Sequence, residues 1–186
     1  MTPPAGAGRD RPAPRAARGP GARAALHRER EAYEAGDERP IGGYLAVMAA
    51  YVGGVAALTA AARRTGRPVP APGPWDVLLM AGAVHRLSRL LAKDPVTSPL
   101  RLPFARLRGQ AGPAEVNEDA RGTGVRRAVG ELVTCPFCTG LWIATAVTGG
   151  QVLAPRTTRL VCSGLTALTV ADLLHFARVG LQHAVE

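Results

Sequence analysis

Two cysteines separated by two residues, Cys135 and Cys138, are the strongest local signal for chemistry in this sequence of 186 residues. A Cys-x-x-Cys pair places two thiols within one helical turn, close enough to hold a metal ion or to form a disulfide. Pro136 suits an early helical position, so we expect Cys135 at the N-terminus of a helix, where the helix dipole favours the thiolate. The pair is therefore a candidate metal or redox site, and zinc is the one cofactor that the sequence suggests.

Three interpretations of this pair stay open. If the last two apolar segments form a hairpin that turns near Thr157, His175 comes within about one turn of Cys138, with Asp172 nearby, and could complete a metal cluster. The third cysteine, Cys162, would then lie at the far end of the hairpin, so we expect it to be a packing residue. Thiol redox chemistry is the second interpretation. The third, which we favour, is that Cys135 and Cys138 are reduced side chains packed between helices.

A second group of polar residues lies within apolar segments. An acidic side chain in an apolar helix is costly and normally pairs with a cation. Asp172 is such a residue, and Arg86 and Arg89 lie on one face of another segment. We therefore expect an ion pair between Asp172 and one of these arginines. The alternative is that the basic face binds a phosphate or lipid headgroup. The complete candidate polar cluster is Arg86, Arg89, Asp94, Arg101, Asp172 and His175.

The elements that must position these residues are long apolar segments. Residues 40–62 and 132–155 contain no charged residue, and each window exceeds the ~20 residues that cross a ~30 Å hydrocarbon core. Two further segments are apolar but interrupted by charges. We therefore predict an all-α fold, a polytopic membrane helical bundle with four spans at about 41–62, 75–93, 135–154 and 159–181.

The arginines predict how this bundle is oriented. Eight arginines precede Ile41 and seven basic residues lie in 93–127, whereas the two other connections carry three and two. The positive-inside rule then places both termini and the loop 94–131 in the cytoplasm. Residues 1–39, rich in Arg, Pro and Ala, are predicted to be a disordered cytoplasmic tail, in which the alternating charges of Leu26–Ala35 indicate a short helix outside the membrane. Residues 40–182 are the predicted membrane domain.

The net charge of +9 favours an anionic partner, and the position of the arginines indicates which kind. Arginines beside membrane spans favour a lipid bilayer with anionic headgroups, and further membrane proteins are the other partners that we consider. Nucleic acid is not expected, because neither interleaved aromatic residues nor a recognisable binding module accompanies the arginines.

Two segments together resemble a known family. Residues 85–104 (HRLSRLLAKDPVTSPLRLPF) and 131–142 (ELVTCPFCTGLW) are similar to domain-of-unknown-function family 1360, small bacterial integral membrane proteins that include a sporulation-associated member. The similarity extends to VADLLH at 170–175. We expect Gly140 and Trp142 of the second segment to be packing residues. The resemblance implies a multi-span bacterial membrane protein and brings no established activity.

The function that we predict is a structural or interaction role in the bacterial cell envelope, linked to stress or sporulation by the family resemblance. An enzyme is not favoured, because the sequence has no nucleophile–base arrangement, phosphate loop or HExxH-type zinc motif. One alternative is a membrane-embedded enzyme or binder for an anionic lipid-linked substrate, built on Asp172, His175, Arg86 and Arg89. The other is a metal or redox sensor built on the Cys-x-x-Cys pair.

Overall fold

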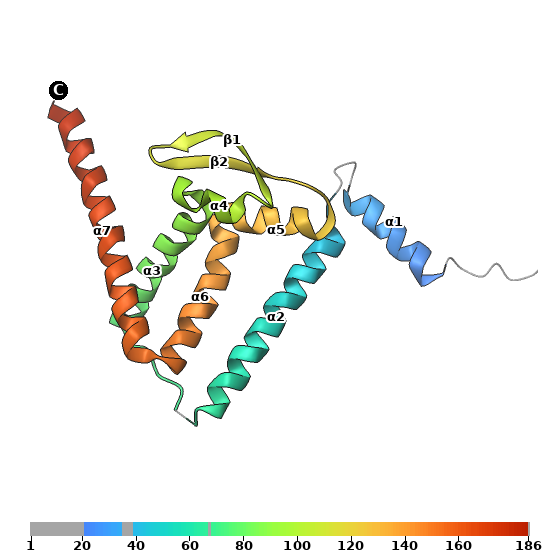
Figure 1. Ribbon diagram of the computed structural model, residues 1–186, viewed down its shortest axis with the longest axis horizontal. Helices are drawn as coiled ribbons and strands as arrows, with labels where there is room; N and C mark the ends of the chain where they lie inside the picture. The colour runs from blue at the N-terminus through green and yellow to red at the C-terminus, as the bar shows by residue number, and fades with distance from the viewer. Residues whose placement is uncertain (1–20, 35–38, 67, 186) are drawn as a thin grey trace, which may run out of the picture. The chain divides into compact units, whose positions relative to one another are not determined.

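The computed structural model describes residues 21–34, 39–66 and 68–185. The chain divides into two compact units, residues 1–39 and 40–186. In the first unit, helix α1 (Ala22–Glu34) forms within the region predicted to be a disordered tail (Figure 1). The rest of that predicted tail, apart from Gly21 and Arg39, lies outside the described residues.

Four long helices organise the second unit: α2 (Ile41–Arg64), α3 (Pro74–Lys93), α6 (Pro136–Leu153) and α7 (Pro155–Val185). Helix α6 packs against both α2 and α3, and α3 packs against α7 (Figure 1). Helices α3, α6 and α7 begin with proline, whose missing N–H costs nothing at a first helical position. Helix α3 ends before Pro95, which disfavours continuation of the helix.

Two of the four predicted spans have the length and composition to cross a membrane on their own, α2 and α7. A third candidate is α5 (Gly124–Thr134) together with α6, a pair bent by 83° at Cys135. The fold is therefore mostly helical with two candidate membrane spans.

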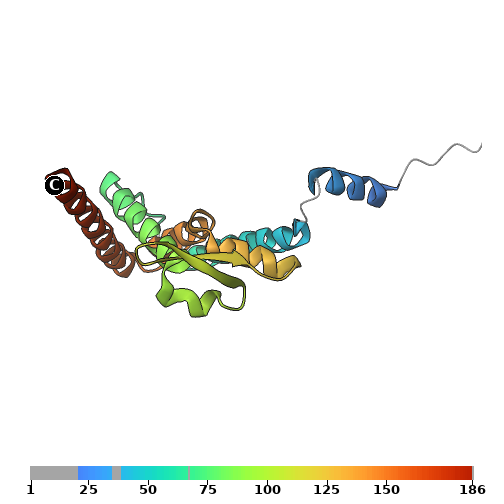
Figure 2. The same cartoon turned by 90° about the horizontal axis from the view of Figure 1, so that it is seen from above.

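The segment between α3 and α6 corrects the prediction of an all-α fold. Instead of a plain loop, it forms the short helices η1 (Pro95–Thr97) and α4 (Ser98–Arg101), and the antiparallel strands β1 (Ala105–Gly112) and β2 (Glu115–Ala120). The hairpin lies beside α4 and α5 (Figures 1 and 2). Its strands carry opposite charges, and Arg108 of β1 pairs with Asp119 of β2. Such cross-strand pairs stabilise a hairpin that lacks an apolar pattern.

The most extensive helix packing occurs between α3 and α7. Leu79 and Ala83 of α3 are buried against Cys162 of α7. A Cβ atom added to Gly82 would lie 2.5 Å from Thr166 Oγ1, so the glycine permits this approach. By contrast, large apolar side chains on the outer faces of α2 and α7 are exposed, among them Leu45, Met48, Val52, Leu160 and Leu174. Small residues at helix contacts and apolar residues outside are typical of membrane proteins.

Candidate functional site

A cavity of about 410 Å³ lies between α3, α7 and the tip of the β1–β2 hairpin. It is the place where the structure brings the predicted polar residues together. The lining includes five of the six members of the predicted cluster: Arg86, Arg89, Asp94, Asp172 and His175. Apolar side chains complete one wall, so charged and apolar groups meet in the same cavity. The large apolar members are Leu90, Leu173 and Phe176.

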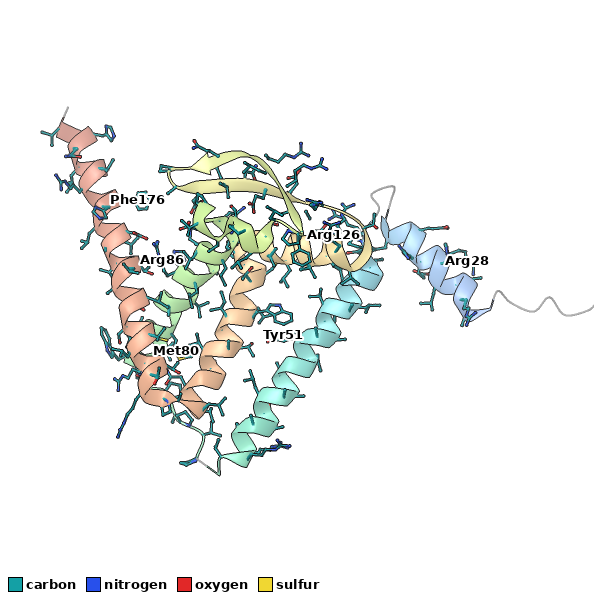
Figure 3. All side chains as sticks on the ribbon, in the orientation of Figure 1. Arg28, Tyr51, Met80, Arg86, Arg126 and Phe176 are labelled. Atoms are coloured by element: carbon teal, nitrogen blue, oxygen red, sulfur yellow. The ribbon has the colours of Figure 1, made fainter. Side chains whose placement is uncertain are left out.

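The central contact in this cavity is an ion pair between Arg86 Nη1 and Asp172 Oδ2 (Figure 3 labels Arg86). Their side chains are 32% and 44% exposed. Two hydrogen bonds fix the register that makes this pair, because Thr166 Oγ1 donates to Leu79 O at 2.7 Å and Thr169 Oγ1 donates to Gly82 O at 3.1 Å. Of the two partners expected for Asp172, the structure provides Arg86.

Arg89, the other expected partner of Asp172, pairs instead with Glu115 Oε1 at the start of β2. Glu115 follows directly after the turn that joins the strands, where Ala114 has φ of 58°. The hairpin therefore places a carboxylate on the arginine face of α3. The sequence patterns considered did not indicate Glu115, because no hairpin was expected. Arginines at 106 and 108, followed by acidic residues at 115, 118 and 119, could have indicated two strands of opposite charge.

Arg101, the sixth member of the predicted cluster, lies outside the cavity lining and is 1% exposed. It forms an ion pair with Glu118 of β2, and the side chain of Glu118 is 6% exposed. Its remaining N–H groups reach the C-terminal end of α3 and the helices that follow it: Leu91 O at 2.7 Å, Asp94 O at 3.0 Å, Thr97 Oγ1 at 2.6 Å and Ser98 Oγ at 3.1 Å. A buried charge with this many partners fixes the hairpin to α3.

Asp94 has a structural contact as well as a place in the cavity lining. Val96 N donates to Asp94 Oδ1 at 2.8 Å, so the carboxylate caps η1. The cavity thus contains two arginines and three carboxylates, those of Asp94, Glu115 and Asp172. The basic face that the sequence predicted on α3 is therefore compensated by negative charge.

The Cys-x-x-Cys pair lies apart from this cavity, at the junction of α5 and α6. Cys135 precedes Pro136 and is the N-cap of α6, and Cys138 N donates to Cys135 Sγ at 3.3 Å. Cys135 is partly buried, whereas Cys138 is exposed, so the predicted packing of both thiols between helices is wrong for Cys138. The reason is the 83° bend, which leaves the first turn of α6 uncovered on one side.

The surroundings of Cys135, which lies before the first residue of α6, favour its thiolate. Partial burial opposes ionisation, but hydrogen bonds from the thiol and backbone N–H of Cys138 and from the backbone of Phe137 outweigh it. Together with the positive charge of Lys93, they hold the pKa of Cys135 below its ordinary value.

The metal cluster of Cys135, Cys138 and His175 is not assembled. Helix α7 packs along α3, so His175 lies at the cavity, away from the cysteine pair. Within residues 21–34, 39–66 and 68–185, no group of three or more His, Cys, Asp and Glu side chains is placed to hold a metal ion. The structure therefore gives no support to the predicted zinc site.

Gly140 and Trp142 follow the cysteines and face different neighbours of α6. A Cβ atom at Gly140 would lie 3.8 Å from Ser88 Cβ of α3. The Trp142 ring meets Tyr51 of α2 edge to face, with centroids 5.2 Å apart (Figure 3 labels Tyr51). Tyr51 also bonds to Thr145 Oγ1 at 2.8 Å. These residues position α6, and with it the cysteine pair, between α2 and α3.

Comparison with known proteins identifies relatives that share this region. Residues 79–178, which include the cavity residues and the cysteine pair, match the family described as "Protein of unknown function (DUF1360)". A protein of Bacillus subtilis (strain 168) named "Sporulation protein YjcA" is 37% identical over 83 residues, which cover 43% of this chain and 70% of that protein. No solved structure matches the chain.

Proposed function

Because this chain belongs to the DUF1360 family, whose function is unknown, we propose that it is a multi-span membrane protein with a structural or interaction role in the bacterial cell envelope. A link to sporulation or stress is part of the proposal, supported by the name of the Bacillus subtilis relative. Other membrane proteins and anionic lipid headgroups are the partners that we propose.

The observation that carries this proposal is the separation of polar and apolar groups along the helices. Between α3 and α7 the ion pairs lie towards the two ends of the contact: Arg86 and Arg89 meet Asp172 and Glu115 beside the hairpin, and Asp76 meets Arg159 at the opposite end. The flanks of α2 and α7 present large exposed apolar side chains. In water this surface would be costly, whereas in a bilayer it contacts lipid.

Helix packing supports the proposal that four helices, and not only α2 and α7, cross the membrane. The bonds from Thr166 to Leu79 and from Thr169 to Gly82 hold α3 at the depth of α7. The Tyr51–Trp142 contact holds α6 at the depth of α2. A bilayer that encloses α2 and α7 therefore also encloses much of α3 and α6. This gives the proposed four-span bundle.

The distribution of arginines supports a cytoplasmic location for the end that carries the hairpin. This end also carries both termini of the four-helix unit, and the opposite end has the two connections with fewer basic residues. Arg106, Arg108 and Arg126 are exposed at the proposed cytoplasmic end, where they can contact anionic headgroups (Figure 3 labels Arg126).

Membrane fractionation tests this proposal. The protein expressed in a bacterial host should remain in the membrane pellet after extraction with alkaline carbonate, which releases peripheral proteins. Recovery of folded protein in the carbonate supernatant would contradict an integral membrane protein. The proposed envelope role is tested separately, by deleting the gene and measuring survival of the cells and, where the host sporulates, their spore yield.

A second candidate function, binding of an anionic lipid-linked substrate, is favoured by the mixed lining of the cavity. Each guanidinium carries five N–H donors, so Arg86 and Arg89 can bind a phosphate oxygen while they keep their carboxylate partners. Leu173 and Phe176 provide an apolar wall for the adjoining lipid chain. This candidate places the headgroup beside α3 and α7 at the proposed cytoplasmic boundary.

Copurification of phosphatidylglycerol with the protein tests this candidate, and a second variant serves as a matched control. Phosphatidylglycerol should copurify with the wild-type protein and be lost in the Arg86→Gln/Arg89→Gln variant. The control is Asp76→Asn/Arg159→Gln, which removes an ion pair of 3.2 Å between the same two helices at their other end. Equal retention of phosphatidylglycerol in all three proteins would exclude the cavity as the binding site.

A further inference from the structure

The two cysteines at the start of α6 have a geometry suited to disulfide formation, and this geometry is independent of the cavity and of the proposed envelope role. Cys135 and Cys138 are free thiols at the first turn of α6, and the backbone N–H of Cys138 points at Cys135 Sγ at 3.3 Å. Two thiols in this arrangement at a helix N-terminus can join as a disulfide without unfolding the helix. The third cysteine, Cys162, is 1% exposed between α3 and α7 and takes no part.

The junction also gives a partner access to the pair. Cys138 is exposed, and Phe137 between the two cysteines is 91% exposed. An exposed aromatic ring beside a thiol offers an apolar contact to an approaching molecule.

The two thiols differ in a way that assigns their roles. Cys135 Sγ accepts the N–H at the start of α6 and lies near the ammonium group of Lys93, and both interactions stabilise a thiolate. Cys138 instead supplies the hydrogen bond. Cys135 is therefore the attacking sulfur and Cys138 the resolving sulfur.

We propose that Cys135 and Cys138 form a reversible dithiol–disulfide couple that exchanges with an accessible disulfide bond of a partner. The Cys135 thiolate attacks one partner sulfur, the partner S–S bond breaks, and one partner sulfur leaves as a thiolate. Cys138 loses its proton to water and attacks Cys135 in the mixed disulfide. The Cys135–Cys138 bond forms, and the second partner sulfur leaves as a thiolate. The dithiol is oxidised by two electrons and the partner disulfide is reduced by two.

Thiol trapping on the full-length protein in detergent tests this proposal. The reduced protein is freed of reductant and incubated with cystine, a low-molecular-weight disulfide, or with insulin, a protein disulfide. Remaining thiols are then labelled after unfolding and mapped by mass spectrometry. We expect Cys135 and Cys138 to lose their thiols together while Cys162 stays labelled. Reaction with cystine alone assigns a low-molecular-weight partner, and reaction with insulin assigns a protein partner.

Three variants separate exchange from nonspecific oxidation. Cys138→Ser should accumulate a mixed disulfide at Cys135, Cys135→Ser should form at least tenfold less mixed disulfide, and Cys162→Ser should behave as the wild type. Failure of the wild-type protein to form the Cys135–Cys138 disulfide with either probe would overturn the proposal. Equal trapping in Cys138→Ser and Cys135→Ser would overturn the assigned roles. Because the wild-type arm needs no substitution, a poorly folding variant leaves the main test intact.

Discussion

Arg86 of α3 and Asp172 of α7 form an ion pair between residues 86 positions apart in the sequence. Two hydrogen bonds precede this pair along the same two helices, from Thr166 Oγ1 to Leu79 O and from Thr169 Oγ1 to Gly82 O. Three polar contacts in succession thus fix the register of two parallel helices, which also share a buried apolar contact of Leu79 and Ala83 with Cys162. In a bilayer, where apolar contacts alone do not favour one register, such bonds select it.

The first prediction concerns the specificity of this pair. Asp172→Asn should lower the free energy of unfolding by about 1 kcal/mol, a value reduced for its partial exposure. Adding Arg86→Gln should recover part of the loss, because neither charge is then left unpaired. Thermal unfolding in detergent measures both effects. Adding Arg89→Gln should give no recovery, since Arg89 pairs with Glu115, and an equal recovery with Arg89→Gln would contradict the pairing.

The second prediction concerns the buried pair of Arg101 and Glu118. Glu118→Gln leaves a buried guanidinium without its counter-charge and should lower the free energy of unfolding by about 3 kcal/mol. Limited proteolysis at the hairpin and chemical unfolding provide the measurement. The exposed pair of Arg108 and Asp119 supplies the control, because Asp119→Asn should cost less than about 1 kcal/mol. Similar losses in the two variants would show that the hairpin is not fixed through Arg101.

The third prediction tests the close approach of α3 and α7. Gly82→Ala places a Cβ atom 2.5 Å from Thr166 Oγ1 and should destabilise the protein by about 1–3 kcal/mol. Gly53→Ala in α2 is the control, because a Cβ atom there meets nothing within 4 Å and alanine favours helix. Thr166→Ala in the Gly82→Ala background should restore part of the thermal stability. No difference between the two glycine variants would rule out the observed packing of α3 on α7.

The fourth prediction is a pH dependence of the Cys135 thiol. Because the pKa of Cys135 is held below its ordinary value, alkylation of this thiol should stay fast at a pH where an ordinary thiol is already protonated. Lys93→Gln removes a positive charge that stabilises the thiolate, so it should raise the pKa and move the profile to higher pH. Lys93→Arg keeps the charge and should leave the profile near that of the wild type. Rates of iodoacetamide alkylation, resolved by peptide, measure the shift. An unmoved profile in Lys93→Gln would exclude Lys93 as a cause.

Much of the helical framework could be predicted from the sequence, because charge-free windows and prolines mark helices locally. The bounds of α3, Pro74–Lys93, differ from the predicted span 75–93 by one residue. An unusual acid in an apolar helix likewise indicated that Asp172 needed a cation. Such signals are local, so they depend little on which helices become neighbours.

Helix neighbours and the hairpin could not be predicted in the same way. We placed α7 against α6 and so expected His175 near Cys138, whereas the hydroxyls of Thr166 and Thr169 bind α3 carbonyl groups and hold α7 there. The presence of threonines within an apolar helix does not predict which neighbouring helix will accept their hydrogen bonds. The hairpin was missed because its strands are held by charge pairs and by Arg101, and not by an alternating apolar pattern.

In the proposed topology the end of the membrane protein that carries the hairpin faces the cytoplasm, and cysteine accessibility in intact cells measures on which side it lies. Single cysteines are placed at Gly112 in the hairpin and at Ala71 between α2 and α3, in a background with the native cysteines changed to serine. Intact cells are treated with a membrane-impermeant maleimide. We predict labelling at Ala71 in intact cells and at Gly112 only after permeabilisation. Labelling of Gly112 from outside intact cells, or protection of Ala71, would contradict the proposed topology.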